Sequence, residues 1–264
     1  MGIYKQGYRK FEGKLQGRFG RIMTIFKNEF IRRLKNKWVL ALLLLAWVLG
    51  FLPTILTGGF MFFFVTGFIW ILLFTAVAGG PIIAEDIEYN AITLYFSRPI
   101  ERMDYFIGKY LTLFALISLI ALLPNIFISA YVVGMLYGTS TEGFDYYTFG
   151  YSLIGIGILM TFVFTNLGMA FSALTKNFKY AAGGIFTVIF FSNIISIVLS
   201  NLYRNIIYCS IWSNFLIIFN KFNDFRDNDA LDFDPIISFG ILMLISIICL
   251  IIIWFRIYKA EVSE

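Results

Sequence analysis

Six long runs of apolar residues, none containing Asp, Glu, Lys or Arg, dominate the 264-residue chain and restrict what it can fold into. A helix needs roughly 20 such residues to cross a hydrocarbon core about 30 Å thick, because each residue rises about 1.5 Å. Barrel strands would be about ten residues long with alternating polarity. The runs therefore predict an all-α membrane protein with six transmembrane helices. They are Trp38–Thr57, Gly59–Ala84, Tyr110–Tyr137, Tyr151–Thr175, Ala181–Leu202 and Pro235–Phe255.

Composition supports a lipid environment. The chain is 59% hydrophobic and 14% charged, whereas soluble domains average about 45–50% apolar and about 25% charged residues. Pro53 and the pair Gly58-Gly59 predict the turn that separates the first two helices. The segment before the first run is too long and too charged for a cleavable signal peptide. Cys209 and Cys249 do not indicate a disulfide framework.

The basic residues predict the orientation. Of the 21 Lys and Arg residues, 11 precede Trp38 and another seven follow the second, fourth and sixth runs. Only Arg204, Lys221 and Arg226 fall on the other side. The positive-inside rule therefore predicts an integral plasma-membrane protein with both termini in the cytoplasm. The net charge of +5 then reflects topology, and no nucleic-acid partner is predicted.

The segment before the last run is ambiguous in length. Asn205–Asn220 has 16 uncharged residues, just short of a span, and charge does not decide whether it crosses as a seventh helix. Its polar content favours a re-entrant or surface-lying hairpin on the outer face. An acidic loop follows, and it lacks the glycine and the terminal glutamate of a calcium-binding hand loop. We therefore predict a solvated turn rather than a metal site there. Its acidic residues are Asp224, Asp227, Asp229, Asp232 and Asp234.

The basic segment Phe19–Leu34 has the spacing of an amphipathic helix. Apolar residues recur at intervals of three and four, which places them on one helical face. This pattern predicts a helix on the cytoplasmic surface of the membrane, and an ordinary juxtamembrane anchor is the simpler alternative. The apolar residues are Phe19, Ile22, Met23, Phe26, Phe30 and Leu34.

The one long predicted cytoplasmic loop between spans is Glu85–Tyr105. Ile87, Ala91, Leu94 and Tyr95 have the spacing of one helical face, and Pro99 ends that helix. A short helix held under the membrane suits docking to a soluble partner. A solvated loop that merely follows the positive-inside rule is the alternative.

The chain lacks the residues that several kinds of catalytic and metal-binding site require. The chain has no histidine, so neither histidine acid–base catalysis nor an HExxH zinc site is present. The phosphate-binding motif of ATPases is absent too, since Gly108-Lys109 is followed by Tyr110. We predict no catalytic residue, no metal ligand and no directly bound cofactor. Charged residues are missing from the spans, which argues against an ion-coupled carrier.

Polar and small residues within the spans remain to be explained. Asn166 and Asn193 are predicted to form hydrogen bonds between helices, and Asn125 lies beside Pro124. A substrate path through Asn125, Asn166 and Asn193 is the weaker alternative. Gly80–Ala84 and Gly168–Ser172 have the small-xxx-small spacing that lets helices pack closely.

In the order of its segments, the chain resembles the permease subunits of ABC-2-type transporters. These segments are a basic amphipathic helix, six spans, a cytoplasmic loop after the second span and an outer hairpin before the last. The local match is an acidic residue leaving the second span, a Ser-Arg-Pro turn, an Arg and a Gly-Lys opening the third span. Here these are Glu85, Ser97-Arg98-Pro99, Arg102 and Gly108-Lys109. The pattern is similar to the subgroup that includes the nitrous-oxide-reductase maturation permease. The chain departs from it at Asn90-Ala91, where the family often has Gly-Thr.

The resemblance implies an ABC-2-type exporter fold and a layout of segments. Residues 1–18 would be a basic cytoplasmic tail, 19–37 a connecting helix and 38–256 the six-span domain. That domain would include a coupling loop at 85–105 and an outer hairpin with the acidic loop at 203–234, before a tail at 257–264. The residues implied in coupling to an ATPase are Glu85, Asp86, Glu88, Leu94, Ser97, Arg98, Pro99, Arg102 and Lys109.

The resemblance also implies partners. A separate ABC ATPase subunit would bind ATP and Mg²⁺, and a second copy of the permease would complete a homodimer in the lipid bilayer. This assembly allows an extracytoplasmic partner as well. The alternative function is a membrane pore or an assembly or immunity scaffold that works without an ATPase. The sequence does not predict the substrate.

Overall fold

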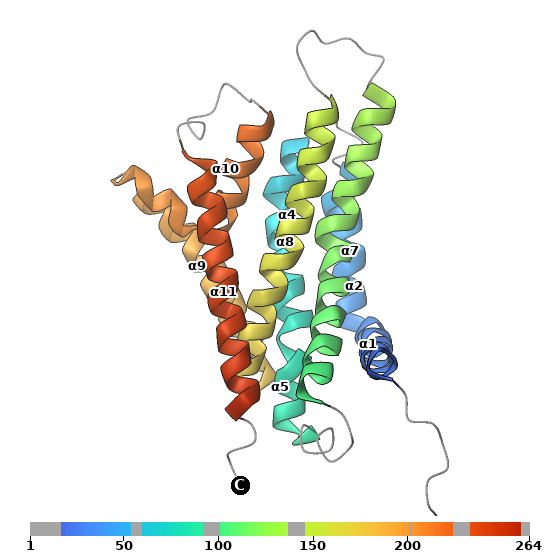
Figure 1. Cartoon of the computed structure of the whole chain (residues 1–264). Helices are drawn as coiled ribbons and strands as arrows, with labels where there is room; N and C mark the ends of the chain where they lie inside the picture. Colours follow the sequence, from blue (N-terminus) through green and yellow to red (C-terminus); the bar gives the residue numbers. More distant parts are fainter. Residues whose placement is uncertain are drawn as a thin grey trace, which may run out of the picture.

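Helices account for nearly all of the residues that the computed structural model describes, which are 17–53, 60–91, 101–136, 146–200, 202–223 and 233–259. Among these residues there is no strand, and the long helices lie side by side (Figure 1). The predicted all-α membrane class is thereby confirmed. The elements are α1 (Arg18–Leu34), α2 (Lys37–Leu45), the π-helix η1 (Ala46–Phe51), α4 (Phe60–Phe74), the π-helix η2 (Thr75–Gly79), α5 (Pro81–Glu88), α7 (Arg102–Leu136), α8 (Tyr146–Leu174), α9 (Phe178–Leu199), the 3₁₀-helix η3 (Arg204–Cys209), α10 (Ile211–Asn223) and α11 (Pro235–Lys259).

Five helices in the described part of the chain are long and apolar enough to cross a membrane. The pair α1 and α2, which meet at a bend of 74°, makes a sixth if it is counted as one broken span. Polar side chains cap several of the helix starts, because the first amide groups of a helix have no intrahelical partner. The side chains of Asn36, Asn177 and Asp234 accept hydrogen bonds from the backbone at the starts of α2, α9 and α11.

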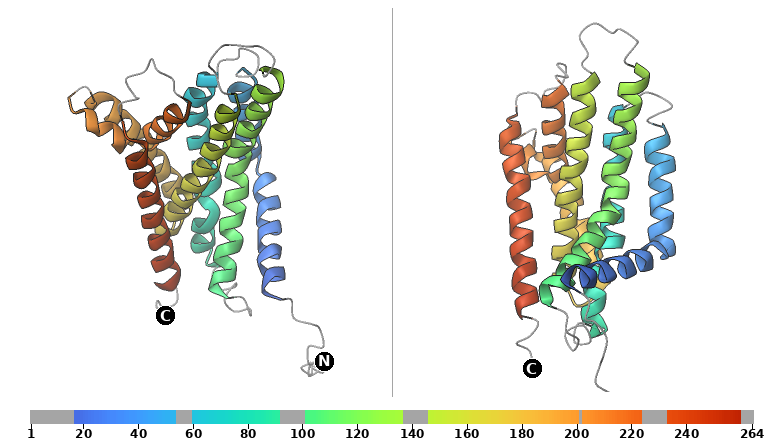
Figure 2. Two further views of the ribbon diagram at one scale, coloured as in Figure 1. Left: turned by 45° about the horizontal axis from the view of Figure 1, so that its top comes forward. Right: turned by 45° about the vertical axis from the view of Figure 1, so that its right-hand side comes forward.

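Helix α1 lies across one end of the bundle, at a steep angle to α2 (Figure 2). We call this end the charged end. The side chains of α1 that are buried against the bundle are Ile25, Glu29 and Arg33, four residues apart. Of the predicted apolar face, Phe30 and Leu34 are half-buried against the core, whereas Phe19 is 74% exposed and Met23 43% exposed. The predicted face therefore overlaps the docked one only in part, because the most buried stripe also contains Glu29 and Arg33.

Close backbone contacts hold the second and fourth spans together. A Cβ added at Gly79 would lie 3.1 Å from the Cα of Gly168, so the two helices touch through their glycines. One turn further along α8, the hydroxyl of Ser172 bonds to the backbone at the start of α5. The small-residue spacing therefore serves packing within the chain.

Helix α10 lies at the end of the bundle away from α1, beside α8 and α11 (Figure 1). It has 13 residues and is not among the helices long enough to span. Ile211, Phe215 and Phe219 are buried at four-residue intervals, so one stripe of α10 packs into the bundle. This arrangement fits the re-entrant hairpin better than a seventh span. Of the acidic loop, only Asp234 falls within the described residues.

Candidate functional site

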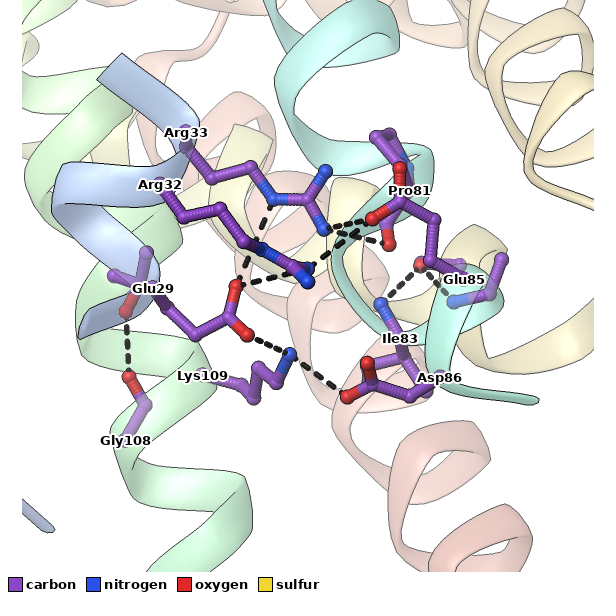
Figure 3. Close-up of polar contacts among 12 residues, drawn as sticks. Glu29, Arg32, Arg33, Pro81, Ile83, Glu85, Asp86, Gly108 and Lys109 are labelled. Carbon is purple, nitrogen blue, oxygen red and sulfur yellow. Dashed lines mark hydrogen bonds and ion pairs between the residues drawn. The ribbon is translucent and has the colours of Figure 1, made fainter. Parts of the chain in front are cut away.

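Six charged side chains meet at the charged end, where α1, α5 and α7 come together (Figure 3). They comprise three carboxylates and three cations, so the group is neutral overall. We call this group the charged cluster. Its members are Glu29, Arg32 and Arg33 from α1, Glu85 and Asp86 from α5, and Lys109 from α7.

Lys109 is the central residue of the charged cluster. Its Nζ lies 2.8 Å from Oε1 of Glu29 and 2.8 Å from Oδ2 of Asp86. Lys109 is completely buried, and both carboxylates are at most 5% exposed. Tyr105 donates a hydrogen bond of 2.7 Å to the same oxygen of Asp86. Buried charges are tolerated only when they are paired and hydrogen-bonded. One ammonium therefore ties three helices to one another.

A second connection runs from α1 to α5. Nη2 of Arg33 donates to the carbonyl oxygen of Pro81 at 3.0 Å and to Oε2 of Glu85 at 2.8 Å. Arg32 adds an ion pair of 3.2 Å with Glu85. Within α1, Oε2 of Glu29 lies 3.2 Å from Nη2 of Arg32 and 3.8 Å from Nε of Arg33. Both arginines therefore pair with Glu29 on their own helix and with Glu85 on α5.

The first turn of α1 makes a separate, more exposed set of ion pairs. Arg18 and Arg21 both reach Asp104 of α7 at 2.8 Å, and both lie within 3.7 Å of Glu101. The hydrogen bond to Asp104, together with the charges of Glu101 and Asp104, raises the pKa of the Arg18 guanidinium. Arg18 therefore stays charged, and its pairing orients the start of α1.

Gly108 sets the distance between α1 and α7. A Cβ at this position would lie 2.8 Å from Cγ2 of Ile25, closer than real contacts allow. Any larger residue would therefore push α1 away from α7. The Gly-Lys pair thus serves two functions: the glycine lets α1 approach, and Lys109 then reaches Glu29.

The second span is irregular where it enters the charged end. The π-helix η2 is followed by Gly80 and then by Pro81, which has no amide hydrogen to donate. Ser172 of α8 bridges this point, because its hydroxyl donates to the carbonyl of Gly80 at 2.7 Å and accepts from the amides of Ile83 and Ala84 at 2.8 and 2.9 Å. These bonds use the full capacity of one hydroxyl.

The structure brings together some of the residues implied in coupling and not others. Glu85, Asp86 and Lys109 join the charged cluster, but they belong to helices rather than to a loop. Glu88 is exposed at the end of α5, and Arg102 begins α7. Four of the implied residues lie outside the described part of the chain. They are Leu94, Ser97, Arg98 and Pro99.

The prediction that Ile87, Ala91, Leu94 and Tyr95 share one helical face is wrong for its first two residues, and Leu94 and Tyr95 lie outside the described residues. Helix α5 ends at Glu88, and Asn90 has a φ of 51°, in the left-handed region. Asparagine tolerates that conformation better than most residues, and it commonly follows a helix end. Ile87 and Ala91 therefore belong to different elements.

The three span asparagines have separate environments. Nδ2 of Asn125 donates to the carbonyl of Ala121 in its own helix, and Oδ1 of Asn193 accepts from Ser210 at 3.3 Å. Asn166 is fully buried, and neither of its amide atoms has a partner among the described residues. Only Asn193 thus makes the predicted bond between elements. A substrate path through these residues stays a prediction.

Sequence reasoning missed Glu29 and Arg33, which take part in four of the six ion pairs of the charged cluster. One signal was present, because Glu29 is the only acidic residue between Glu12 and Glu85. A lone carboxylate in a strongly basic helix indicates a specific cation partner. The partner itself lies 80 residues away, at Lys109, and local spacing does not point to it.

Residues 59–255, from the start of the second span to the end of the last, match the family described as ABC-2 family transporter protein. The chain belongs to the ABC-2 transporter family. No curated protein matches it. The chain is thus a membrane permease component of an ABC transporter, a class that associates with an ABC ATPase subunit. The narrower subgroup stays a prediction. Of the charged cluster, the ABC-2 match covers α5 and α7, whereas α1 lies before it.

Proposed function

We propose that the chain is the permease subunit of an ATP-driven exporter, and that the charged cluster transmits force from a separate ATPase subunit to the spans. The observation that carries this proposal is the position of Lys109, whose ammonium bonds to α1 and α5 while its backbone belongs to α7. The segment between α5 and α7 would be the ATPase contact. A push on that segment would then move the ends of two spans and α1 together.

The irregular second span provides a pivot for this movement. Helix α5 has eight residues and begins at Pro81, immediately after η2 and Gly80. A π-turn and a proline both weaken the regular helical ladder, and such sites often coincide with function. Ser172 of α8 satisfies the backbone groups at the break, so the pivot between α4 and α5 is anchored to the fourth span.

Neutrality lets the cluster move as a unit. Three carboxylates and three cations are paired over short distances, so a displacement of α1 with α5 would carry no net charge into lipid. ATP and Mg²⁺ would bind the partner subunit. The free energy for switching would come from their different affinity for the two states of the assembly. The transporter would be a homodimer in the plasma membrane, with both termini and the charged end on the cytoplasmic side.

The first experiment is to purify the tagged full chain from its native membrane in mild detergent and to identify what accompanies it by mass spectrometry. We expect a stoichiometric soluble subunit with an ATP-binding motif. The second step is to reconstitute both in lipid vesicles and to measure stimulated ATPase activity for wild type and for Arg98→Glu with Arg102→Glu. The matched control is Lys176→Glu, a charge reversal at an exposed residue between α8 and α9.

The double variant should insert normally and lose stimulation, while Lys176→Glu keeps it. A chain that purifies alone under several detergents, and that functions without nucleotide, would support a pore or an assembly or immunity scaffold instead. Unchanged stimulation in the double variant would leave the transporter assembly in place but remove the proposed contact at residues 89–101.

A further inference from the structure

A long recess opens on the side of the bundle, away from the charged cluster. Its volume is about 740 Å³, and 13 residues from α7, α8, α10 and α11 line it. It follows α8 from Thr148 to Phe162, which are 14 residues and about 21 Å apart at 1.5 Å per residue. Phe222 of α10, 60% exposed, and Phe239 of α11, 49% exposed, line its other side. We call this recess the lateral groove.

The lateral groove is apolar along nearly its whole length, and its few polar groups lie at one end. Its three hydroxyl-bearing residues, Thr148, Tyr151 and Ser152, all lie in the first two turns of α8. From Gly155 onward the lining is aliphatic and aromatic. In a bilayer the first turns of α8 lie near the headgroups of the leaflet opposite the charged end. The gradient therefore matches that of a lipid, with a polar head at the membrane surface and a hydrocarbon chain below.

The length of the lateral groove suits an acyl chain. Its volume is about 740 Å³ along about 21 Å, and it is open along its side. One leaflet of the hydrocarbon core is about 15 Å deep, so an extended chain that starts at the hydroxyl-bearing end would follow the groove past the bilayer middle.

Gly155 keeps the groove open. A Cβ added there would meet nothing within 4 Å, whereas a Cβ at Gly157, two residues away, would lie 3.0 Å from Asn125. Gly157 is thus needed for the close packing of α8 on α7. Packing does not require a glycine at position 155. A glycine inside a helix is destabilising relative to alanine. Its position on the wall of the groove leaves room for an occupant.

We propose that the lateral groove is a binding site for one acyl chain of a membrane lipid from the leaflet opposite the charged end. The lipid headgroup would lie at the hydroxyl-bearing end, and the chain would run along Gly155 and Leu159 to Phe162. An empty apolar recess of this size would leave its walls without dispersion contacts, and water would find few partners in it. Helix α10 forms one wall, which provides a role for the hairpin before the last span.

The test uses the full chain in nanodiscs of phosphatidylcholine that contain a trace of phosphatidylcholine with a diazirine near the middle of one acyl chain. After irradiation, mass spectrometry locates the adducts. We expect wild type to be labelled at Leu159, Phe162 and Met243 above the level at Ile247 and Ile251. The last two residues are about half exposed on α11 and do not line the groove.

Gly155→Phe should reduce groove labelling roughly tenfold, because displacing about two methylene groups costs about 1.6 kcal/mol. Labelling at Ile247 should not change. Gly134→Phe is the matched control, since a Cβ there also meets nothing within 4 Å and the residue is on α7 outside the groove. If Gly155→Phe fails to fold, Met243→Trp fills the groove from α11 instead.

Two results would overturn the assignment. One is labelling of Leu159 and Phe162 no stronger than that of Ile247 and insensitive to both filling variants. The other is efficient disulfide formation between two copies of Ile158→Cys in the bilayer, which would assign the groove to a second protein chain. Neither result depends on an ATPase subunit, so the groove and the proposed coupling are tested independently.

Discussion

Replacing Lys109 by methionine tests the central bond of the charged cluster. The change keeps the length of the side chain but removes the ammonium that lies 2.8 Å from both Glu29 and Asp86. Two carboxylates that are at most 5% exposed then lose their shared cation. Breaking a buried ion pair in this way costs about 3–5 kcal/mol. At about 2–4 °C per kcal/mol, the melting temperature should fall by roughly 6–20 °C.

The assay is thermal unfolding of the purified chain in detergent, followed by the loss of monodisperse protein on size-exclusion chromatography. The control is Lys176→Met, which removes an exposed lysine and should change stability by less than about 0.5 kcal/mol. Asp86→Asn combined with Lys109→Met should recover much of the loss, because the cluster is neutral again and Tyr105 keeps an oxygen to which it can donate. Equal shifts for Lys109→Met and Lys176→Met would refute the reasoning.

Three further substitutions test neighbouring contacts. Gly108→Ala would place a Cβ 2.8 Å from Ile25 and force α1 outward, so ATPase stimulation in vesicles should fall while insertion is retained. Ser172→Ala removes three hydrogen bonds at the pivot and should lower the free energy of unfolding by about 1–3 kcal/mol, with faster hydrogen exchange at residues 80–84. Asp104→Asn should lower the free energy of unfolding by about 1–3 kcal/mol, because the buried carboxylate accepts hydrogen bonds from both Arg18 and Arg21, and should speed proteolysis at the start of α1.

Each of these substitutions has a matched control in the same chain. Gly134→Ala adds a methyl group where nothing lies within 4 Å. Ser118→Ala removes a hydroxyl that bonds only within its own helix, to Ala115. Glu101→Gln neutralises a carboxylate that is 62% exposed at the same corner as Asp104. If a control substitution had the same effect as its test substitution, the role proposed for the corresponding contact would be contradicted.

The sequence predicted part of the candidate site. The resemblance implied coupling roles for Glu85, Asp86 and Lys109, and the structure brings these three together. It did not predict that Lys109 is completely buried. The positive-inside rule describes how lysines flank spans, but it does not tell a solvated lysine from one that a neighbouring helix covers. The covering helix is α1, and no local pattern places it.

The sequence by itself determined the class of protein and its helices, because uncharged runs of span length have no other stable arrangement in lipid. It also predicted that α1 is amphipathic and that small residues pack between spans. Only the tertiary structure decided which stripe of α1 is buried, that Glu29 meets Lys109, and that Gly155 faces an open groove while Gly157 packs against α7. These outcomes depend on contacts between distant segments, whose geometry is set by how the helices pack and not by the periodicity of any one of them.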